Sequence, residues 1–98
     1  MRYFPVFTDL DGRACLVVGG GETAARKVRL LRRARAAVDV VAPSVNGELA
    51  ELAEAGAITH TGRVFCAADV FGKALVIAGT EIAEVDERVA EVARAANV

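Results

Sequence analysis

The fold is decided by residues 17–24, which read VVGGGETA. This segment fits the pattern G-x-G-x-x-A through Gly19, Gly21 and Ala24. Gly19 allows a sharp turn out of a strand, Gly21 lets a phosphate approach the backbone, and Ala24 lets the next helix pack close to that strand. Free N–H groups at the start of such a helix favour an anion. The segment therefore predicts a phosphate-binding turn between a strand and a helix.

The sequence on either side of the turn supplies the context that the pattern requires. Residues 14–18 are continuously apolar, which is typical of a strand buried on both faces. Residues 22–35 predict a helix, because Ala24, Val28 and Leu31 form an apolar stripe and basic residues close the segment. The alternative is a tight turn between these two elements that binds nothing.

The rest of the chain alternates in the same way. Strands are expected at residues 37–42, 57–61 and 74–78, helices at 46–55 and 82–96, and one helical turn at 67–71. Residues 3–7, which contain Pro5, predict an edge strand or an extended lead-in. Strand–helix–strand units of this length pair their strands in parallel. We expect a single α/β domain over residues 1–98, a Rossmann-like doubly wound parallel sheet in three α/β/α layers with the strand at 14–18 central.

Ligands of such sheets bind at the carboxyl ends of the strands, so residues after the other strands are also candidates. Ser44, after the second strand, could orient a ribose. The acid that usually holds this ribose is missing, because Asp39 lies near the start of the strand. Thr80 could cap the last helix, contact a cofactor, or do both.

Composition excludes several other classes of function. The 98 residues carry a net charge of −1, which gives no basic field for nucleic acid or an anionic membrane. No apolar run reaches the ~20 residues of a membrane span, and the early Asp9 and Asp11 speak against a signal peptide, so we expect a cytoplasmic protein. Cys15 and Cys66 are expected to be buried thiols. With His60 as the only histidine, no metal site is expected.

Several segments together resemble a known family. Residues 4–7, 16–27, 40–44, 63–65 and 75–80 are similar, in this order, to the N-terminal domain of siroheme synthases, the precorrin-2 dehydrogenase family. The most specific stretch is GGGETAARK at residues 19–27. The resemblance implies NAD as cofactor, the oxidation of the tetrapyrrole precorrin-2 to sirohydrochlorin, and a homodimeric full-length protein, often with ferrochelatase activity.

The resemblance also implies site residues. NAD contacts fall on Glu22 and Thr23, on Pro43 and Ser44, and on Thr80. With the glycines, the candidate cofactor-binding residues are Gly19, Gly20, Gly21, Glu22, Thr23, Pro43, Ser44, Gly79 and Thr80. The chain departs from the family at Gly79, where an alanine is usual, and at Glu81, Ile82 and Asp86, where two acids and an asparagine are usual.

The catalytic aspartate of the family would lie beyond Val98, so no catalytic residue is expected here. We expect the domain to be truncated after the fourth strand and its helix, and the fragment alone to be inactive. The fourth strand would then be an exposed edge, or the last helix would be half covered. Two other hypotheses are a nucleotide-sensing module without catalysis and a remnant domain without a ligand.

Overall fold

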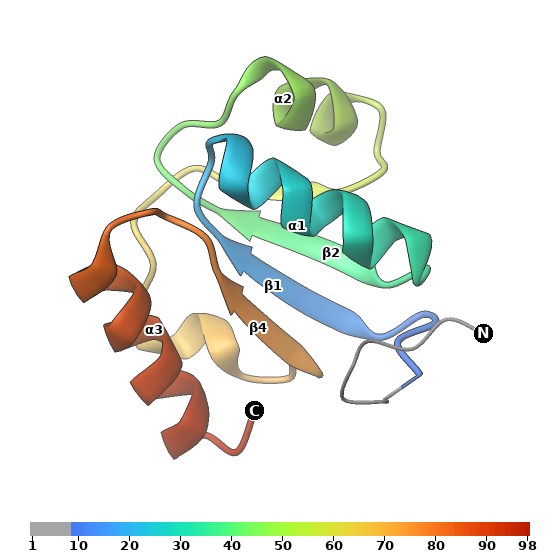
Figure 1. Ribbon diagram of the computed structural model, residues 1–98. Coiled ribbons are helices and arrows are strands. Elements are labelled where there is room, and N and C mark those ends of the chain that lie inside the picture. The colour runs from blue at the N-terminus through green and yellow to red at the C-terminus, as the bar shows by residue number, and fades with distance from the viewer. Residues whose placement is uncertain (1–8) are drawn as a thin grey trace.

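A computed structural model describes residues 9–98 of the chain (Figure 1). The expected strands and helices are confirmed, with ends that shift by up to two residues. The expected segment at residues 3–7 lies outside the described part. The elements are β1 (Ala14–Val18), α1 (Glu22–Arg33), β2 (Ala37–Val41), α2 (Gly47–Glu54), β3 (Thr59–Thr61), the short 3-10 helix η1 (Ala67–Val70), β4 (Leu75–Ala78) and α3 (Ala83–Ala95).

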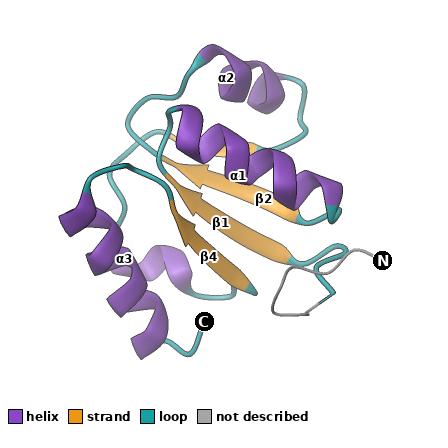
Figure 2. Cartoon of the chain, in the orientation of Figure 1, coloured by secondary structure: helices purple, strands orange, loops and turns teal. Residues whose placement is uncertain are grey.

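The four strands form one parallel sheet in the order β3-β2-β1-β4, so β1 is central as expected. Val17 of β1 pairs with Val40 of β2 on one side and with Ile77 of β4 on the other. Helices α1 and α2 cover one face of the sheet, while η1 and α3 cover the other (Figures 1 and 2). The Rossmann-like, doubly wound α/β prediction is thus confirmed.

Strand β1 supplies both layers of the core because its side chains alternate between the two faces of the sheet. Cys15 and Val17 belong to the cluster packed under α1, and Leu16 and Val18 belong to the cluster on the α3 side. Burial raises the pKa of the Cys15 thiol above its usual value, so this thiol is kept neutral inside the core.

One sequence prediction about burial needs correction. Cys66 is exposed, because it precedes η1 on the surface and caps that short helix. Ile82 is also 54% exposed, because α3 begins one residue after it. The residues of β4 are half-buried, because β4 is the last strand at its edge of the described sheet.

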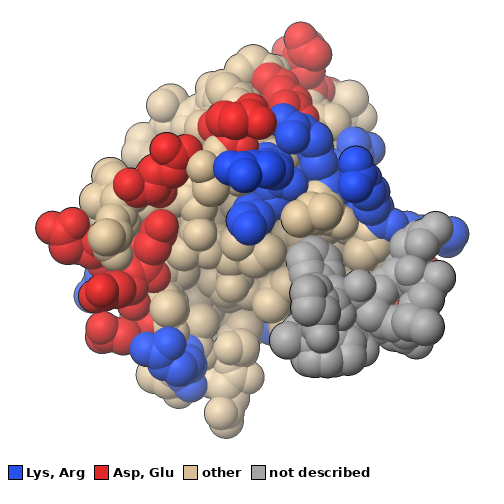
Figure 3. All heavy atoms as spheres, in the orientation of Figure 1, with Lys and Arg blue, Asp and Glu red and all other residues tan. Residues whose placement is uncertain are grey.

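Charge is distributed unevenly over the surface. Lys and Arg side chains gather over α1, while Asp and Glu side chains gather over α2 and the outer part of α3 (Figure 3). Arg29 links the two regions: its Nε lies 2.7 Å from Glu48 Oε2, and its Nη2 lies 2.9 Å from Glu22 Oε2. The hydrogen bond from Arg29 lowers the pKa of Glu48 below its usual value. This interaction fastens α2 to the surface of α1.

Candidate nucleotide-binding cleft

A cleft of about 860 Å³ opens at the carboxyl ends of β1, β2 and β4. Its position is the one at which open α/β sheets bind ligands. Six of the nine candidate residues border the cleft, and the remaining three, Glu22, Thr23 and Gly79, do not. The residues that line it are Val18, Gly19, Gly20, Gly21, Val41, Ala42, Pro43, Ser44, Val45, Asn46, Val64, Phe65, Thr80, Ile82, Glu84, Val85 and Arg88.

Two of the three consecutive glycines are required by the fold itself. Gly19 has φ +132°, and a Cβ added there would lie 2.4 Å from the carbonyl oxygen of Gly79. A Cβ added at Gly20 would lie 2.0 Å from the carbonyl oxygen of Ser44. Gly19 therefore lets the loop after β4 approach β1, and Gly20 does the same for the loop after β2.

Gly21 is different. Its φ is −99° and ψ −159°, a conformation open to any residue, and an added Cβ would meet no atom of the described chain within 4 Å. Gly21 is exposed and borders the cleft. The fold thus gives no reason for a glycine here, whereas a ligand seated against the backbone would. This absence of a side chain fits a cradle for a pyrophosphate.

The start of α1 is open in a way that the start of α2 is not. Asn46 caps α2 by accepting a hydrogen bond from the Leu49 N–H at 3.0 Å. Gly21 precedes α1 and has no side chain to do the same. The first N–H groups of this 12-residue helix are therefore left without a side-chain cap next to the cleft, in an arrangement that suits an anion.

Pro43 and Ser44 follow β2, and both are exposed at the cleft. The preceding Ala42 carbonyl is 2.9 Å from His60 Nε2, so the only histidine fastens this loop to β3. Asp39 lies on β2 three residues before Ala42, hydrogen-bonded to Thr59 and 3.5 Å from Lys73 Nζ. Asp39 is therefore engaged elsewhere and does not line the cleft.

Thr80 organises the loop between β4 and α3. Its Oγ1 lies 2.7 Å from Asp86 Oδ1, and its backbone N–H donates to the same oxygen at 3.1 Å. Its hydroxyl oxygen accepts from the Ile82 N–H at 3.1 Å. Thr80 is thus joined both to Asp86 in the first turn of α3 and to Ile82, the residue before that helix, and it also borders the cleft.

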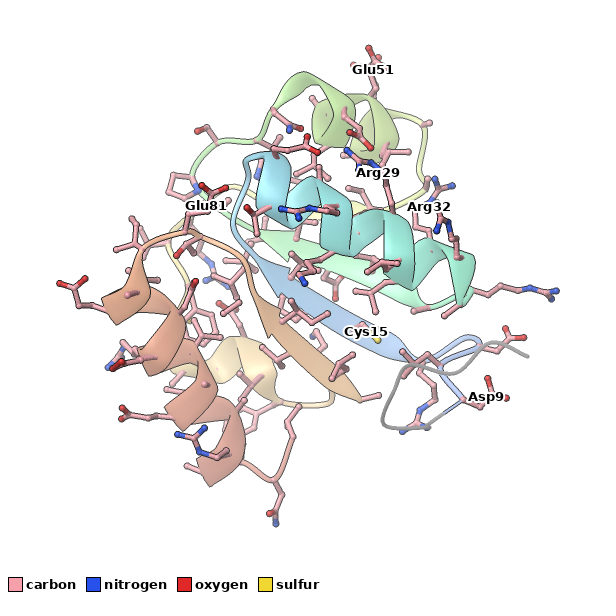
Figure 4. All side chains as sticks on the ribbon, in the orientation of Figure 1. Asp9, Cys15, Arg29, Arg32, Glu51 and Glu81 are labelled. Carbon is pink, nitrogen blue, oxygen red and sulfur yellow. The ribbon has the colours of Figure 1, made fainter. Side chains whose placement is uncertain are left out.

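A second interaction joins this loop to the glycine turn. The Thr23 hydroxyl in the first turn of α1 donates a hydrogen bond to the carboxylate of Glu81. The Glu81 side chain, labelled in Figure 4, lies beside the turn between β1 and α1. Glu81 has φ +67°, unusual for a residue with a side chain. Gly79 is buried, and an added Cβ would lie 3.3 Å from Ala24 Cα, a close contact that glycine avoids. Thr23 and Gly79 therefore act on the packing around the cleft.

One wall of the cleft was not foreseen from the sequence. It consists of the apolar side chains of Val64, Phe65, Ile82 and Val85, of which Val64 is 72% exposed. Phe65 and Val85 also pack against the core cluster on the α3 side. The sequence offered one sign of this wall, the apolar residues Val64 and Phe65 after β3. Their spacing does not show that they line the same cleft as the start of α3.

Beside this wall, Arg63 binds Asp69 through both guanidinium nitrogens, with Nη1 2.9 Å from Oδ2 and Nη2 2.5 Å from Oδ1. Asp69 also accepts from the Cys66 N–H at 2.9 Å, and its side chain is only 9% exposed. The hydrogen bonds from Arg63 are the main cause that lowers the pKa of Asp69 to about 2. Arg63 is therefore engaged in fixing the loop before η1.

This ion pair predicts a pH dependence. The pKa of Asp69 in the folded chain is below its ordinary value of 3.8, so its charged form stabilises the fold above that pH and this stabilisation is lost as the pH falls through about 2. Asp69→Asn should lower the free energy of unfolding most above about pH 4, and this loss should shrink toward pH 2. Urea unfolding at a series of pH values measures it. Glu54→Gln is the control, and a loss that is constant with pH would contradict the prediction.

No helix within residues 9–98 is both long and apolar enough to cross a membrane. No group of three or more His, Cys, Asp or Glu residues in that range is placed to hold a metal ion.

The fold and the cleft define a class, the dinucleotide-binding domains of the Rossmann type. The sequence model of a family described as "Putative NAD(P)-binding" matches residues 6–98. The chain belongs to this NAD(P)-binding family. The cofactor class is accordingly a nicotinamide dinucleotide, which fits the cradle at Gly21.

Two named relatives of the chain are siroheme synthases. The chain is 52% identical over 91 residues to the siroheme synthase of Thioalkalivibrio sulfidiphilus, a match to 93% of this chain and 19% of that protein. It is 47% identical over 98 residues to the siroheme synthase of Methylobacillus flagellatus, covering 100% of this chain and 21% of that protein. The chain thus spans about a fifth of the length of these relatives.

A solved structure shows the same arrangement. The precorrin-2 dehydrogenase SirC superposes with a TM-score of 0.80 at 31% sequence identity, over 89% of this chain and 44% of that chain. The resemblance stated from the sequence, to siroheme synthases and precorrin-2 dehydrogenases, is therefore confirmed.

Proposed function

We propose that this chain is the NAD-binding part of a precorrin-2 dehydrogenase. The observation that carries the proposal is Gly21: a glycine that the fold does not need, at the open start of α1 and at the rim of the cleft. In a bound complex, the backbone at Gly21 admits the pyrophosphate, and the first N–H groups of α1, those of Glu22 and Thr23 included, face its charge.

The two halves of the dinucleotide extend to opposite sides of the glycine turn. The loop after β2 lies on one side and the loop after β4 on the other, because β1 is between these strands. Pro43 and Ser44 then border the adenosine half, with the Ser44 hydroxyl as hydrogen-bond partner of the ribose. Thr80, Ile82 and Val85 border the nicotinamide half.

We further propose that NAD is preferred over NADP. Among the described residues that line the cleft, Arg88 is the only cation, and it belongs to α3 rather than to the loop after β2. That loop, residues 42–46, contains no cation to pair with a 2′-phosphate on the adenosine ribose. Arg63, the nearest basic residue after β3, is bound to Asp69.

This preference gives a prediction with a gain of function. NADP should bind about threefold to tenfold more weakly than NAD, the cost of a charged group without a partner. Pro43→Arg places a guanidinium beside the ribose and should remove most of this difference, because Pro43 is exposed. Calorimetric titration with both dinucleotides measures the ratio, with Arg32→Ala in the last turn of α1 as control, because Arg32 is exposed and does not line the cleft. Tighter binding of NADP by the parent chain would contradict the account.

The proposed reaction is the transfer of a hydride from precorrin-2 to NAD, which yields sirohydrochlorin, NADH and a proton. NAD supplies the redox chemistry when bound, and the residues of this chain position its ring. The tetrapyrrole and a second subunit of the full-length protein are the partners of this proposal.

A chimera tests the reaction. Residues 1–98 replace the matching segment of the Thioalkalivibrio siroheme synthase, and NADH formation from precorrin-2 is followed by absorbance. The chimera should form NADH, and the same chimera with Gly21→Val should not. A folded chimera that binds NAD but forms no NADH would contradict the proposed reaction while leaving the cofactor site standing.

A further inference from the structure

We propose that Asp86 is a positioning residue that makes the Thr80 hydroxyl a hydrogen-bond acceptor toward the cofactor, so that Thr80 accepts from the carboxamide N–H of the nicotinamide. The inference rests on the proposed function, since it concerns the nicotinamide half of a bound NAD. It gives Asp86, which does not itself line the cleft, a part in recognising the cofactor.

The Thr80 hydroxyl has a single proton to donate. Two acceptors lie within reach: Asp86 Oδ1 at 2.7 Å and the Ile82 carbonyl oxygen at 3.3 Å. The shorter bond to a charged carboxylate is the stronger one, so the proton points to Asp86. The Thr80 N–H donates to the same carboxylate oxygen at 3.1 Å, which fixes both groups relative to each other.

With its proton bound to Asp86, the Thr80 hydroxyl can make further hydrogen bonds only as an acceptor. A hydroxyl has one donor and two acceptor lone pairs. The donor is used by Asp86, and one lone pair accepts from the Ile82 N–H at 3.1 Å. The Thr80 hydroxyl therefore has one lone pair left, and Thr80 is among the residues that border the cleft. It can serve only a ligand group that donates.

The position of Thr80 in the cleft indicates which group of the ligand donates to it. Thr80 lies on the β4 side of the glycine turn, opposite the loop of Ser44, and therefore beside the nicotinamide half. The apolar side chains of Ile82 and Val85 border the same part of the cleft and suit a flat ring. On that ring the carboxamide NH₂ is the hydrogen-bond donor. The ribose hydroxyls are donors too, and the experiment separates the two cases.

The test compares NAD with 3-acetylpyridine adenine dinucleotide, in which a methyl group replaces the amide nitrogen and the overall shape is kept. Both ligands are titrated into the purified 98-residue chain, and the quantity compared is the ratio of the two Kd values. The parent chain should bind NAD about fivefold to tenfold more tightly, as expected for one hydrogen bond. Because each ratio compares two ligands on one variant, a partial loss of folded protein cancels.

Variants at position 86 then isolate the role of the carboxylate. In Asp86→Ala the Thr80 proton is free to turn toward the acetyl oxygen of the analogue, so the ratio should fall toward one. Asp86→Asn keeps an acceptor oxygen in place and should restore most of the parental ratio. Glu87→Ala removes the neighbouring exposed carboxylate of α3 and should leave the ratio unchanged.

Equal binding of the two ligands by the parent chain, as expected if a ribose hydroxyl is the donor, would overturn this inference alone. A parental ratio retained in Asp86→Ala would also overturn it, because the discrimination would then come from another group. Failure of a folded parent chain to bind either ligand would overturn the proposed function together with the inference.

Discussion

Gly19→Ala is expected to lower the free energy of unfolding by about 2–6 kcal/mol, the sum of backbone strain and a steric overlap. The strain arises because Gly19 has φ +132°, and the overlap arises because the added Cβ would lie 2.4 Å from the backbone of Gly79. A loss of this size is a large share of the stability of a small domain. Urea unfolding followed by circular dichroism measures it.

Gly56→Ala is the matched control for the steric part of this effect. Gly56 also has a positive φ of +79°, but an added Cβ there would meet no atom within 4 Å. It should therefore cost only about 1–2 kcal/mol, the strain of a left-handed residue. Equal losses in the two variants would show that the close approach of the loop after β4 is not important for stability.

Gly21→Val, unlike Gly19→Ala, is expected to leave the chain folded and to weaken its affinity for NAD. The backbone at Gly21 is extended and open, so the change in stability should stay within about 1 kcal/mol. The valine side chain would occupy the space proposed for the pyrophosphate. We expect binding of NAD to weaken by at least about tenfold, the cost of one steric overlap.

Gly47→Val is the matched control for this variant. Gly47 also stands at the start of a helix in open space, but it is not among the residues that line the cleft. The Gly47→Val variant should bind NAD with the same affinity as the parent chain in calorimetric titrations. An unchanged Kd in Gly21→Val would mean that the pyrophosphate does not pass this glycine.

The glycines at positions 19–21 show which features of the turn could be predicted from the sequence. The pattern of Gly19, Gly21 and Ala24 predicted the turn, and the apolar runs predicted the order of strands and helices, because both are local properties of the chain. The requirement for glycine at position 20 was not explained by the pattern. It depends on the loop after β2, whose Ser44 carbonyl passes within 2.0 Å of the space a Cβ would fill.

The features that the sequence missed all depend on contacts between distant segments. The hydrogen bond from Thr23 to Glu81 joins residues 58 positions apart, and no periodicity could reveal it. The apolar wall arises because Val64 and Ile82, from different loops, meet at one edge of the sheet. Cys66 was assigned to the core on its apolar neighbours, whereas the chain turns into η1 there and leaves it exposed.

The central claim is that this cleft binds NAD, and equilibrium dialysis of the purified 98-residue chain against NAD tests it most directly. Dialysis detects binding whatever its enthalpy, and circular dichroism of the same sample verifies the fold. We predict saturable binding of one NAD per chain. A folded chain that retains no NAD above the level of the buffer compartment would contradict the account.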